Sequence, residues 1–271
     1  IPSKEKSSQS FIKRLFFGNT QTNTEIAIKS YHIHQEALEY IGYDDGYPKK
    51  INLSLLNNTP KKFIKRKTFY FGTDKYGRDL LSRLLIGTRI SFFIGFIAVF
   101  ISLLIGVSIG AIAGYYGGKI DVLIMWLINI TWSIPTLLLV IAITLALGKG
   151  YWQVFIAVGL TMWVEVARVV RGQVLTTKQQ QYVEAARALG YSNFRIIFKH
   201  ILPNIIAPII VISAANFAAA ILIESGLSFL GIGAQPPTPS WGAIIKNHYN
   251  YIILGKPYLA IIPGLAIMSL V

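Results

Sequence analysis

The sequence predicts an all-α polytopic membrane protein, and three observations support this fold class. Hydrophobic residues make up 53% of the 271 residues and charged residues 14%, whereas a soluble domain carries about 25% charge. The mean hydropathy is +0.52. The apolar residues are concentrated in runs with few or no charges, most of them of about 20 residues or more, the length that a helix needs to cross the hydrocarbon core.

Five apolar runs follow one another along the chain, at 90–116, 122–147, 151–170, 205–234 and 258–271. The last run rises only about 21 Å, against a core of about 30 Å. Because it would end inside the bilayer, we expect residues missing at both ends, and about six transmembrane helices in the complete protein, with five represented here. Pro135 and Pro208 are expected to kink their helices.

Lysines and arginines in the short loops predict the orientation, because positive charge in such loops resists translocation. Segment 168–204 holds six of them and the loop near Lys119 a seventh, whereas the alternate loops hold three. We therefore expect 168–204 in the cytoplasm, and 232–257 and 1–89 outside it.

Residues 1–70 are rich in Ser, Asn, Thr, Lys and Tyr and predict an extracytoplasmic segment or small domain, in which the alternation is too poor to assign strands. A basic run near its end could contact lipid headgroups or nucleic acid, although a solvated face is the favoured interpretation. The run comprises Lys61, Lys62, Lys65, Arg66 and Lys67. The net charge of +14 is mainly a topology signal, and we expect no nucleic acid partner.

Several kinds of chemistry are excluded by the residues themselves. The chain has no cysteine, so it forms no disulfide, thiolate zinc site or cysteine nucleophile. Its four histidines share no metal-ligand spacing. Residues 72–78 have the glycine spacing of a P-loop but lack its Lys-Ser/Thr pair. We expect no metal, no bound cofactor and no catalytic activity in this chain.

Residues 71–89 predict an amphipathic helix that lies in the membrane interface and leads into the first span. Thr73 or Asp74 can cap this helix. Asp79 and Arg83 have the i, i+4 spacing of an ion pair.

The loop 172–204 predicts two short helices at an angle on the cytoplasmic surface. Good helix formers occupy 179–189, and Gly190 can end that helix in a left-handed conformation. A second helix is expected over 192–200, with Pro203 placed to stop it before the next span. Alanines in the first helix allow another surface to come close, as for a helix docked in a groove.

Polar side chains within the spans are candidates for function, because each ionisable group there is costly. Glu165 has Arg168 one turn further on, which favours an interfacial ion pair. Glu224 has no basic residue within a turn, so it faces a wet cavity or a partner, and a pathway role and a structural partner on another helix are equally open. Asn129 and Asn216 could line the same cavity, although hydrogen bonds between helices are the commoner use of such residues.

The segment 182–204, with sequence YVEAARALGYSNFRIIFKHILPN, resembles the EAA loop in the integral-membrane subunits of ABC importers, the coupling helix on which the cytoplasmic ATPase sits. His200 stands where the loose family pattern has an aliphatic residue, and HILPN is similar to the peptide-permease branch. The resemblance implies that the ATPase-coupling residues are Glu184, Ala185, Ala186, Gly190, Leu202 and Pro203.

A second segment, 71–89, is similar to the stretch before the second span in C-type subunits of oligopeptide, dipeptide and nickel permeases. The resemblance covers about 70–271 and excludes the first 70 residues. The residues that carry it at this place are Gly72, Thr73, Asp74, Gly77, Arg78, Asp79 and Arg83.

This resemblance implies a type I ABC importer permease fold in the bacterial inner membrane, with a permease domain over 90–271. It implies a lipid membrane, a homologous permease subunit, two ATPase subunits that carry ATP and Mg, and an extracytoplasmic solute-binding protein as partners. The cargo would be a peptide or a related small solute such as nickel. A secondary transporter or channel subunit is the alternative, and it requires inverted repeats, broken helices or a relay of carboxylates.

Overall fold

A computed structural model describes residues 26, 28–34, 37–42, 46–52, 64, 68–148, 150–234 and 238–271. The chain divides into two units, Ile1–Arg83 and Leu84–Val271. The basic residues of the run at 61–67, which are expected to form a solvated face, lie outside the described residues.

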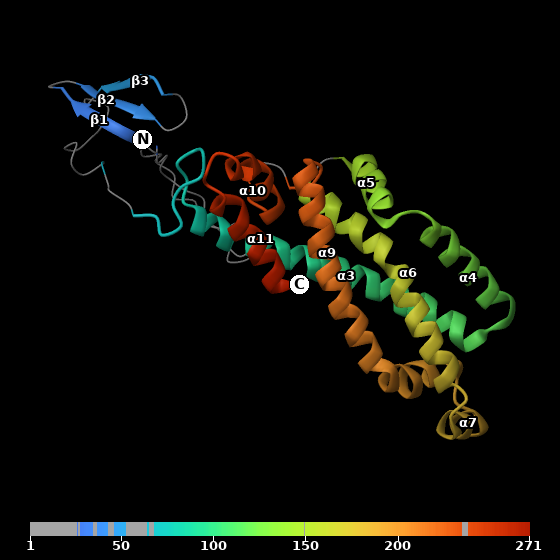
Figure 1. The fold of residues 1–271 in the computed structure, drawn as a ribbon. Helices are drawn as coiled ribbons and strands as arrows, with labels where there is room; N and C mark the ends of the chain where they lie inside the picture. Colours follow the sequence, from blue (N-terminus) through green and yellow to red (C-terminus); the bar gives the residue numbers. More distant parts are fainter. Residues whose placement is uncertain are drawn as a thin grey trace. The chain divides into compact units, whose positions relative to one another are not determined.

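The first unit contains a three-stranded antiparallel sheet of β1 (Ile28–Ile33), β2 (Ala37–Gly42) and β3 (Pro48–Asn52), with β2 in the centre (Figure 1). Leu38 and Tyr40 of β2 are buried, whereas β1 and β3 are largely exposed. Only the central strand therefore alternates in burial, and none of the three strands was predicted from the sequence.

The second unit is helical. Three segments of the described residues are long and apolar enough to cross a membrane, namely Leu80–Tyr116, Trp152–Thr177 and Asn193–Leu230, or four if one bent pair counts as a span. The predicted helical polytopic fold is thereby confirmed. The helices are α3 (Leu80–Tyr116), α4 (Gly118–Ser133), α5 (Thr136–Leu147), α6 (Tyr151–Thr177), α7 (Gln181–Ala188), α8 (Asn193–Ile196), α9 (Ile206–Leu230), α10 (Trp241–His248) and α11 (Tyr258–Leu270).

The bent pair is α4 and α5, which meet at an angle of 89°. The bend expected at Pro135 is therefore present, and it is sharper than a kink, because it divides the run 122–147 between two helices. Pro135 accounts for the break, because proline has no N–H to donate and disfavours helical geometry in the residue before it. Ile134 is accordingly extended, with φ −89° and ψ 127°.

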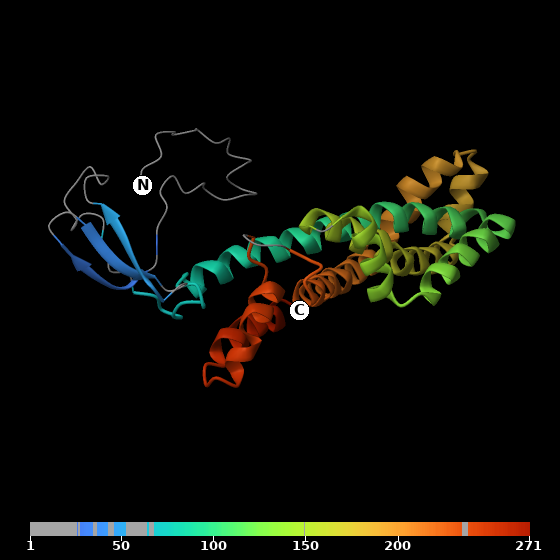
Figure 2. The ribbon, with the colours of Figure 1, turned by 90° about the horizontal axis from the view of Figure 1, so that it is seen from above.

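Three glycines at four-residue spacing lie where α3 packs against α6, and they are Gly106, Gly110 and Gly114. A Cβ on Gly110 would lie 2.5 Å from the carbonyl oxygen of Ala167. A Cβ on Gly106 would lie 2.7 Å from a carbonyl oxygen of α6, and a Cβ on Gly114 would lie 2.8 Å from another. The two backbones thus approach closely, as small residues at this spacing allow in membranes. Helix α6 also packs against α5 and α9 (Figures 1 and 2).

The helical path into α9 is continuous from Asn193 to Leu230. It passes from α8 through a π turn at Ile197–Ile201 and a 3-10 turn at Leu202–Ile205. The expectation that Pro203 stops the helix is wrong. Pro203 lies at the start of the 3-10 turn, where a residue's N–H has no partner within the turn, so the missing proton costs little.

Candidate functional site: the coupling loop

Helix α7 is amphipathic, with one face packed and the other free. Val183 and Ala186 are buried, while Glu184 and Ala185 are exposed. The buried pair joins an apolar cluster with α3, α6 and the start of the next helical segment, whose members include Ala111, Val170, Val174, Ile196, Ile201 and Ile205. Figure 1 shows α7 beyond the end of α6. The structure therefore presents the Glu184–Ala185 face outward on a packed base.

Gly190 ends α7 as the sequence predicts, with φ at +76°. Its N–H donates to the carbonyl oxygen of Arg187 at 3.0 Å, and the N–H of Tyr191 donates to that of Ala186 at 3.2 Å. This pair of bonds is a Schellman motif, which satisfies carbonyls at the end of a helix. The motif fixes the direction in which the chain leaves α7.

The predicted coupling loop, residues 172–204, is tied to the end of α3 by polar contacts. The hydroxyl of Tyr115 donates to Oδ1 of Asn193 at 2.8 Å, and the guanidinium of Arg187 lies 5.9 Å from the Tyr115 ring. Nζ of Lys178 donates to the carbonyl oxygens of Gly114 at 2.8 Å and Tyr115 at 3.4 Å. A cation at the carbonyl end of a helix also interacts favourably with its dipole.

An ion pair joins the start of α4 to α6. Nε and Nη2 of Arg171 donate to the two carboxylate oxygens of Asp121 at 2.5 and 2.6 Å. Such a bidentate pair adds geometric specificity to its charge. This pair was not predicted from the sequence. A signal was present in the two opposite charges that flank neighbouring apolar runs.

The remaining predicted coupling residues lie where the loop enters α9. Leu202 is half-buried and packs against the apolar cluster of the loop, whereas Pro203 is exposed. The coupling role of all six residues stays a prediction.

The predicted helix over 71–89 begins later than expected, at Leu80. Residues 72–79 form a loop that is closed by a β-bridge between Thr73 and Asp79, with Gly72 and Gly77 both at φ +73°. The helix is continuous with the first span and has 37 residues, or about 55 Å, which exceeds the hydrocarbon core of about 30 Å.

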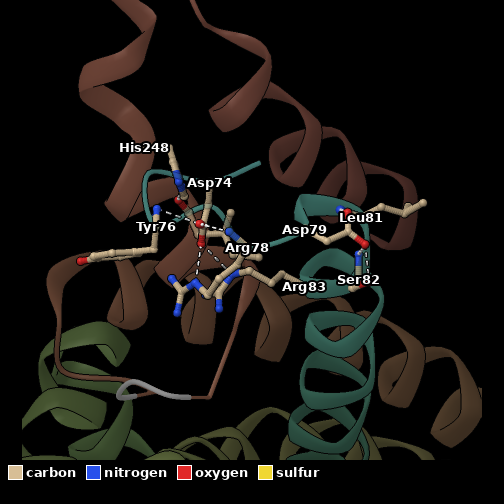
Figure 3. Close-up of polar contacts among 9 residues, drawn as sticks. Asp74, Tyr76, Arg78, Asp79, Leu81, Ser82, Arg83 and His248 are labelled. Atoms are coloured by element: carbon tan, nitrogen blue, oxygen red, sulfur yellow. Dashed lines mark hydrogen bonds and ion pairs between the residues drawn. The ribbon is translucent and has the colours of Figure 1, made fainter. Parts of the chain in front are cut away.

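The polar contacts of this loop differ from those expected (Figure 3). Asp79, rather than Thr73 or Asp74, caps the helix, because its carboxylate accepts from the N–H groups of Leu81 at 3.2 Å and Ser82 at 3.3 Å.

Asp74 instead holds the loop together. Its Oδ1 accepts from the N–H groups of Tyr76 and Arg78 at 2.9 Å, and its Oδ2 accepts from Nε of Arg78 at 2.7 Å. Arg83 pairs with Asp74 at 3.5 Å and not with Asp79. The expected pair fails because Asp79 turns its carboxylate toward the backbone of α3.

The three candidate pathway residues lie in different surroundings. Glu224 and Asn216 are each only 1% exposed on α9. Oε1 of Glu224 accepts from Oγ of Ser228 at 2.6 Å. The Ser228 Oγ in turn accepts from the N–H of Ala234 at 3.0 Å. Asn129 is exposed on α4. None of the three lines the cavity of about 140 Å³ beside the α4–α5 break.

Glu165 does line that cavity, and it lies about midway along α6. The ion pair expected with Arg168 is not formed. The Arg168 guanidinium instead lies 3.8 Å from the centre of the Trp132 ring, and Nη2 donates to Oδ1 of Asn129 at 3.3 Å.

The sequence pattern of the family described as binding-protein-dependent transport system inner membrane component matches residues 106–271. The chain belongs to this family. It is accordingly a multi-pass protein of the bacterial inner membrane, as the resemblance implied.

Relatives of known function are permease proteins. A dipeptide transport system permease protein of Alkalihalophilus pseudofirmus is 42% identical over 74% of this chain and 66% of its own length. An oligopeptide transport system permease protein of Bacillus subtilis is 44% identical over 67% of this chain and 59% of its own length. A glutathione transport system permease protein of Escherichia coli is 39% identical over 86% of this chain and 71% of its own length. Such relatives are transport components rather than enzymes.

The chain spans less than two thirds of the length of the dipeptide and oligopeptide permease proteins that it matches. Among solved structures, a chain of the inward-facing MetNI methionine ABC transporter aligns with a TM-score of 0.56 at 19% identity, over 70% of this chain and 92% of that chain. This likeness shows the fold, which is that of type I ABC importer permeases.

Proposed function

We propose that this chain is the transmembrane permease subunit of an ATP-driven ABC importer. It forms half of the translocation pathway for peptides or a related small solute such as nickel. The observation that carries the proposal is the coupling loop, in which the exposed Glu184–Ala185 face of α7 stands on a base packed against α3 and α6. The permease relatives named for dipeptide, oligopeptide and glutathione transport support the peptide class.

The partners follow from what one subunit does. A homologous permease subunit completes the pathway by pseudo-two-fold pairing. Two ATPase subunits supply the ATP and Mg chemistry, for which this sequence has no P-loop. An extracytoplasmic solute-binding protein delivers the cargo, and the family description names such dependence.

The contacts at the loop give this subunit a way to respond to the ATPases. A partner that contacts Glu184 and Ala185 moves α7, and α7 is fixed to α6 through Val183 and Ala186. The Tyr115–Asn193 bond extends the connection to α3. The three elements then move together, and their movement alternates access between the two sides of the membrane.

The alternative of a secondary transporter or channel subunit requires features such as broken helices. The α4–α5 pair is one broken helix. The family membership favours the binding-protein-dependent importer instead.

The test uses the full-length subunit, assembled with its partner subunits in proteoliposomes. Uptake of trialanine should require both enclosed ATP and the binding protein, and it should stop when the ATPase subunits are omitted. An ion gradient alone should not support uptake. Uptake that persists without ATP and follows the ion gradient would instead favour the secondary transporter.

A further inference from the structure

A small cavity lies beside the break between α4 and α5. Its volume is about 140 Å³, and its walls come from both sides of the break and from α6 and α9. Non-helical backbone at membrane depth is tolerated where it is buried in protein or lines a watered cavity. The cavity residues that matter here are Thr131, Trp132, Thr136, Thr161 and Glu165.

The cavity offers hydrogen-bond acceptors. The hydroxyl of Thr131 donates its proton to the carbonyl oxygen of Leu127 at 3.0 Å, and that of Thr161 donates to Val158 at 2.9 Å. A hydroxyl that donates to its own helix keeps only its acceptor lone pairs for another group. Both threonines therefore present acceptors to whatever occupies the cavity.

Glu165 adds a carboxylate to these acceptors. It is exposed within the subunit, and no cation of the described chain lies within ion-pair distance of it. Arg168 is one turn away but is held by Trp132 and Asn129. A carboxylate in a membrane span without a partner marks a functional group by default.

We propose that this cavity binds the protonated amino group of the transported solute, with Glu165 as its counter-charge and Thr131 and Thr161 as acceptors. An ammonium group has three donors and no acceptor, which matches the lining. The solute class is therefore a cationic or zwitterionic amine, such as a peptide with a free amino terminus. The proposal rests on the proposed function, because it needs the cavity to face the translocation pathway.

The first test measures the charge preference of the cavity directly. The chain has no cysteine, so Thr136→Cys provides a single reactive thiol on the cavity wall. In the complete transporter, with partner subunits that carry no reactive cysteine, a cationic methanethiosulfonate should modify this thiol faster than an anionic one of similar size. Adding Glu165→Gln should reduce that rate ratio by about tenfold, the effect of losing one charged hydrogen-bonding group.

The second test measures transport of trialanine in proteoliposomes at saturating binding protein. Glu165→Gln should lower the uptake rate by about tenfold, while Glu165→Asp should retain most of it. Glu39→Gln on β2, outside the cavity lining, is the matched acid-to-amide control and should transport like the unmodified protein.

The outcomes separate this inference from the proposed function. If the unmodified transporter takes up trialanine but Glu165→Gln is equally fast, or if the rate ratio at Thr136→Cys does not change, the cavity does not bind the amine. If the unmodified transporter shows no ATP-dependent uptake, the proposed function fails as well. Assembly of each variant is checked by size-exclusion chromatography, and the labelling test is made on assembled complex alone.

Discussion

Gly190 shows how one residue shapes the coupling loop. Its φ of +76° is available to glycine and rarely to residues with a Cβ. A Cβ at this position would meet nothing within 4 Å. The penalty for a side chain is therefore one of backbone strain alone, about 1–2 kcal/mol.

Gly190→Ala should accordingly weaken the end of α7 more than it weakens the whole protein. We expect only a small fall in melting temperature but a clear rise in ATP hydrolysed per solute transported, since the exposed face of α7 is no longer held in one direction. Gly264→Ala, at another glycine with no atom within 4 Å, is the control and should leave this ratio unchanged. A normal ratio in Gly190→Ala would contradict the role given to the Schellman motif.

Asp74 and Asp79 lie in the same loop, but their replacement should lower the stability of the protein by different amounts. Asp79→Ala removes a helix cap, at about 1 kcal/mol. Asp74→Ala should cost about 3 kcal/mol, because the Asp74 side chain is fully buried and its loss leaves Arg83, itself largely buried, without its carboxylate. Melting temperatures in detergent should therefore fall further for Asp74→Ala. A larger fall for Asp79→Ala would show that the contacts of Asp74 contribute less to stability than the helix cap does.

The two aspartates also show what the sequence could not decide. Either residue could cap a helix by its chemistry, and the i, i+4 spacing of Asp79 and Arg83 favoured an ion pair. The choice depends on the β-bridge and on Gly72 and Gly77, which bring Asp74 to the arginines. Gly190 was predictable because its signal is local, whereas these contacts depend on how the loop closes.

At the scale of elements, the close approach of α3 to α6 depends on glycine. Gly110→Ala would place a Cβ 2.5 Å from the Ala167 carbonyl oxygen and 3.0 Å from its Cα. Both are backbone atoms, so the helices must separate, and we expect a loss of about 1–3 kcal/mol. Gly172→Ala on α6 meets no atom within 4 Å and should be neutral or slightly stabilising. Equal melting temperatures for the two variants would contradict this packing.

The Asp121–Arg171 pair should contribute to coupling because it joins α4 to α6. Asp121→Asn should raise the ATP hydrolysed per solute transported, and so should Arg171→Gln. The exchange of charges, Asp121→Arg with Arg171→Asp, should restore part of the coupling, since the pair is only partly buried and can re-form. If the exchanged protein is no better than either single variant, the pair does not act as a link.

At the scale of the whole molecule, the apolar runs and basic loops predicted a helical polytopic protein, because span length and charge are properties of local sequence. The break at Pro135 was expected only as a kink, since the angle of 89° depends on the helices that pack around it. The continuous path through Pro203 was missed because it requires a π turn, which has no clear sequence signal. The Arg168–Trp132 contact likewise depends on how α4 lies beside α6.

The central claim is that the exposed face of α7 is the contact through which an ATPase drives this subunit. Because the chain has no cysteine, Ala185→Cys provides a single attachment point for a short photo-crosslinker on that face. In the assembled transporter, illumination should join this subunit to an ATPase subunit, identified by mass spectrometry, whereas Asn250→Cys after α10 should yield no such product. Crosslinks from Ala185→Cys to lipid or to the permease subunits alone would contradict the account.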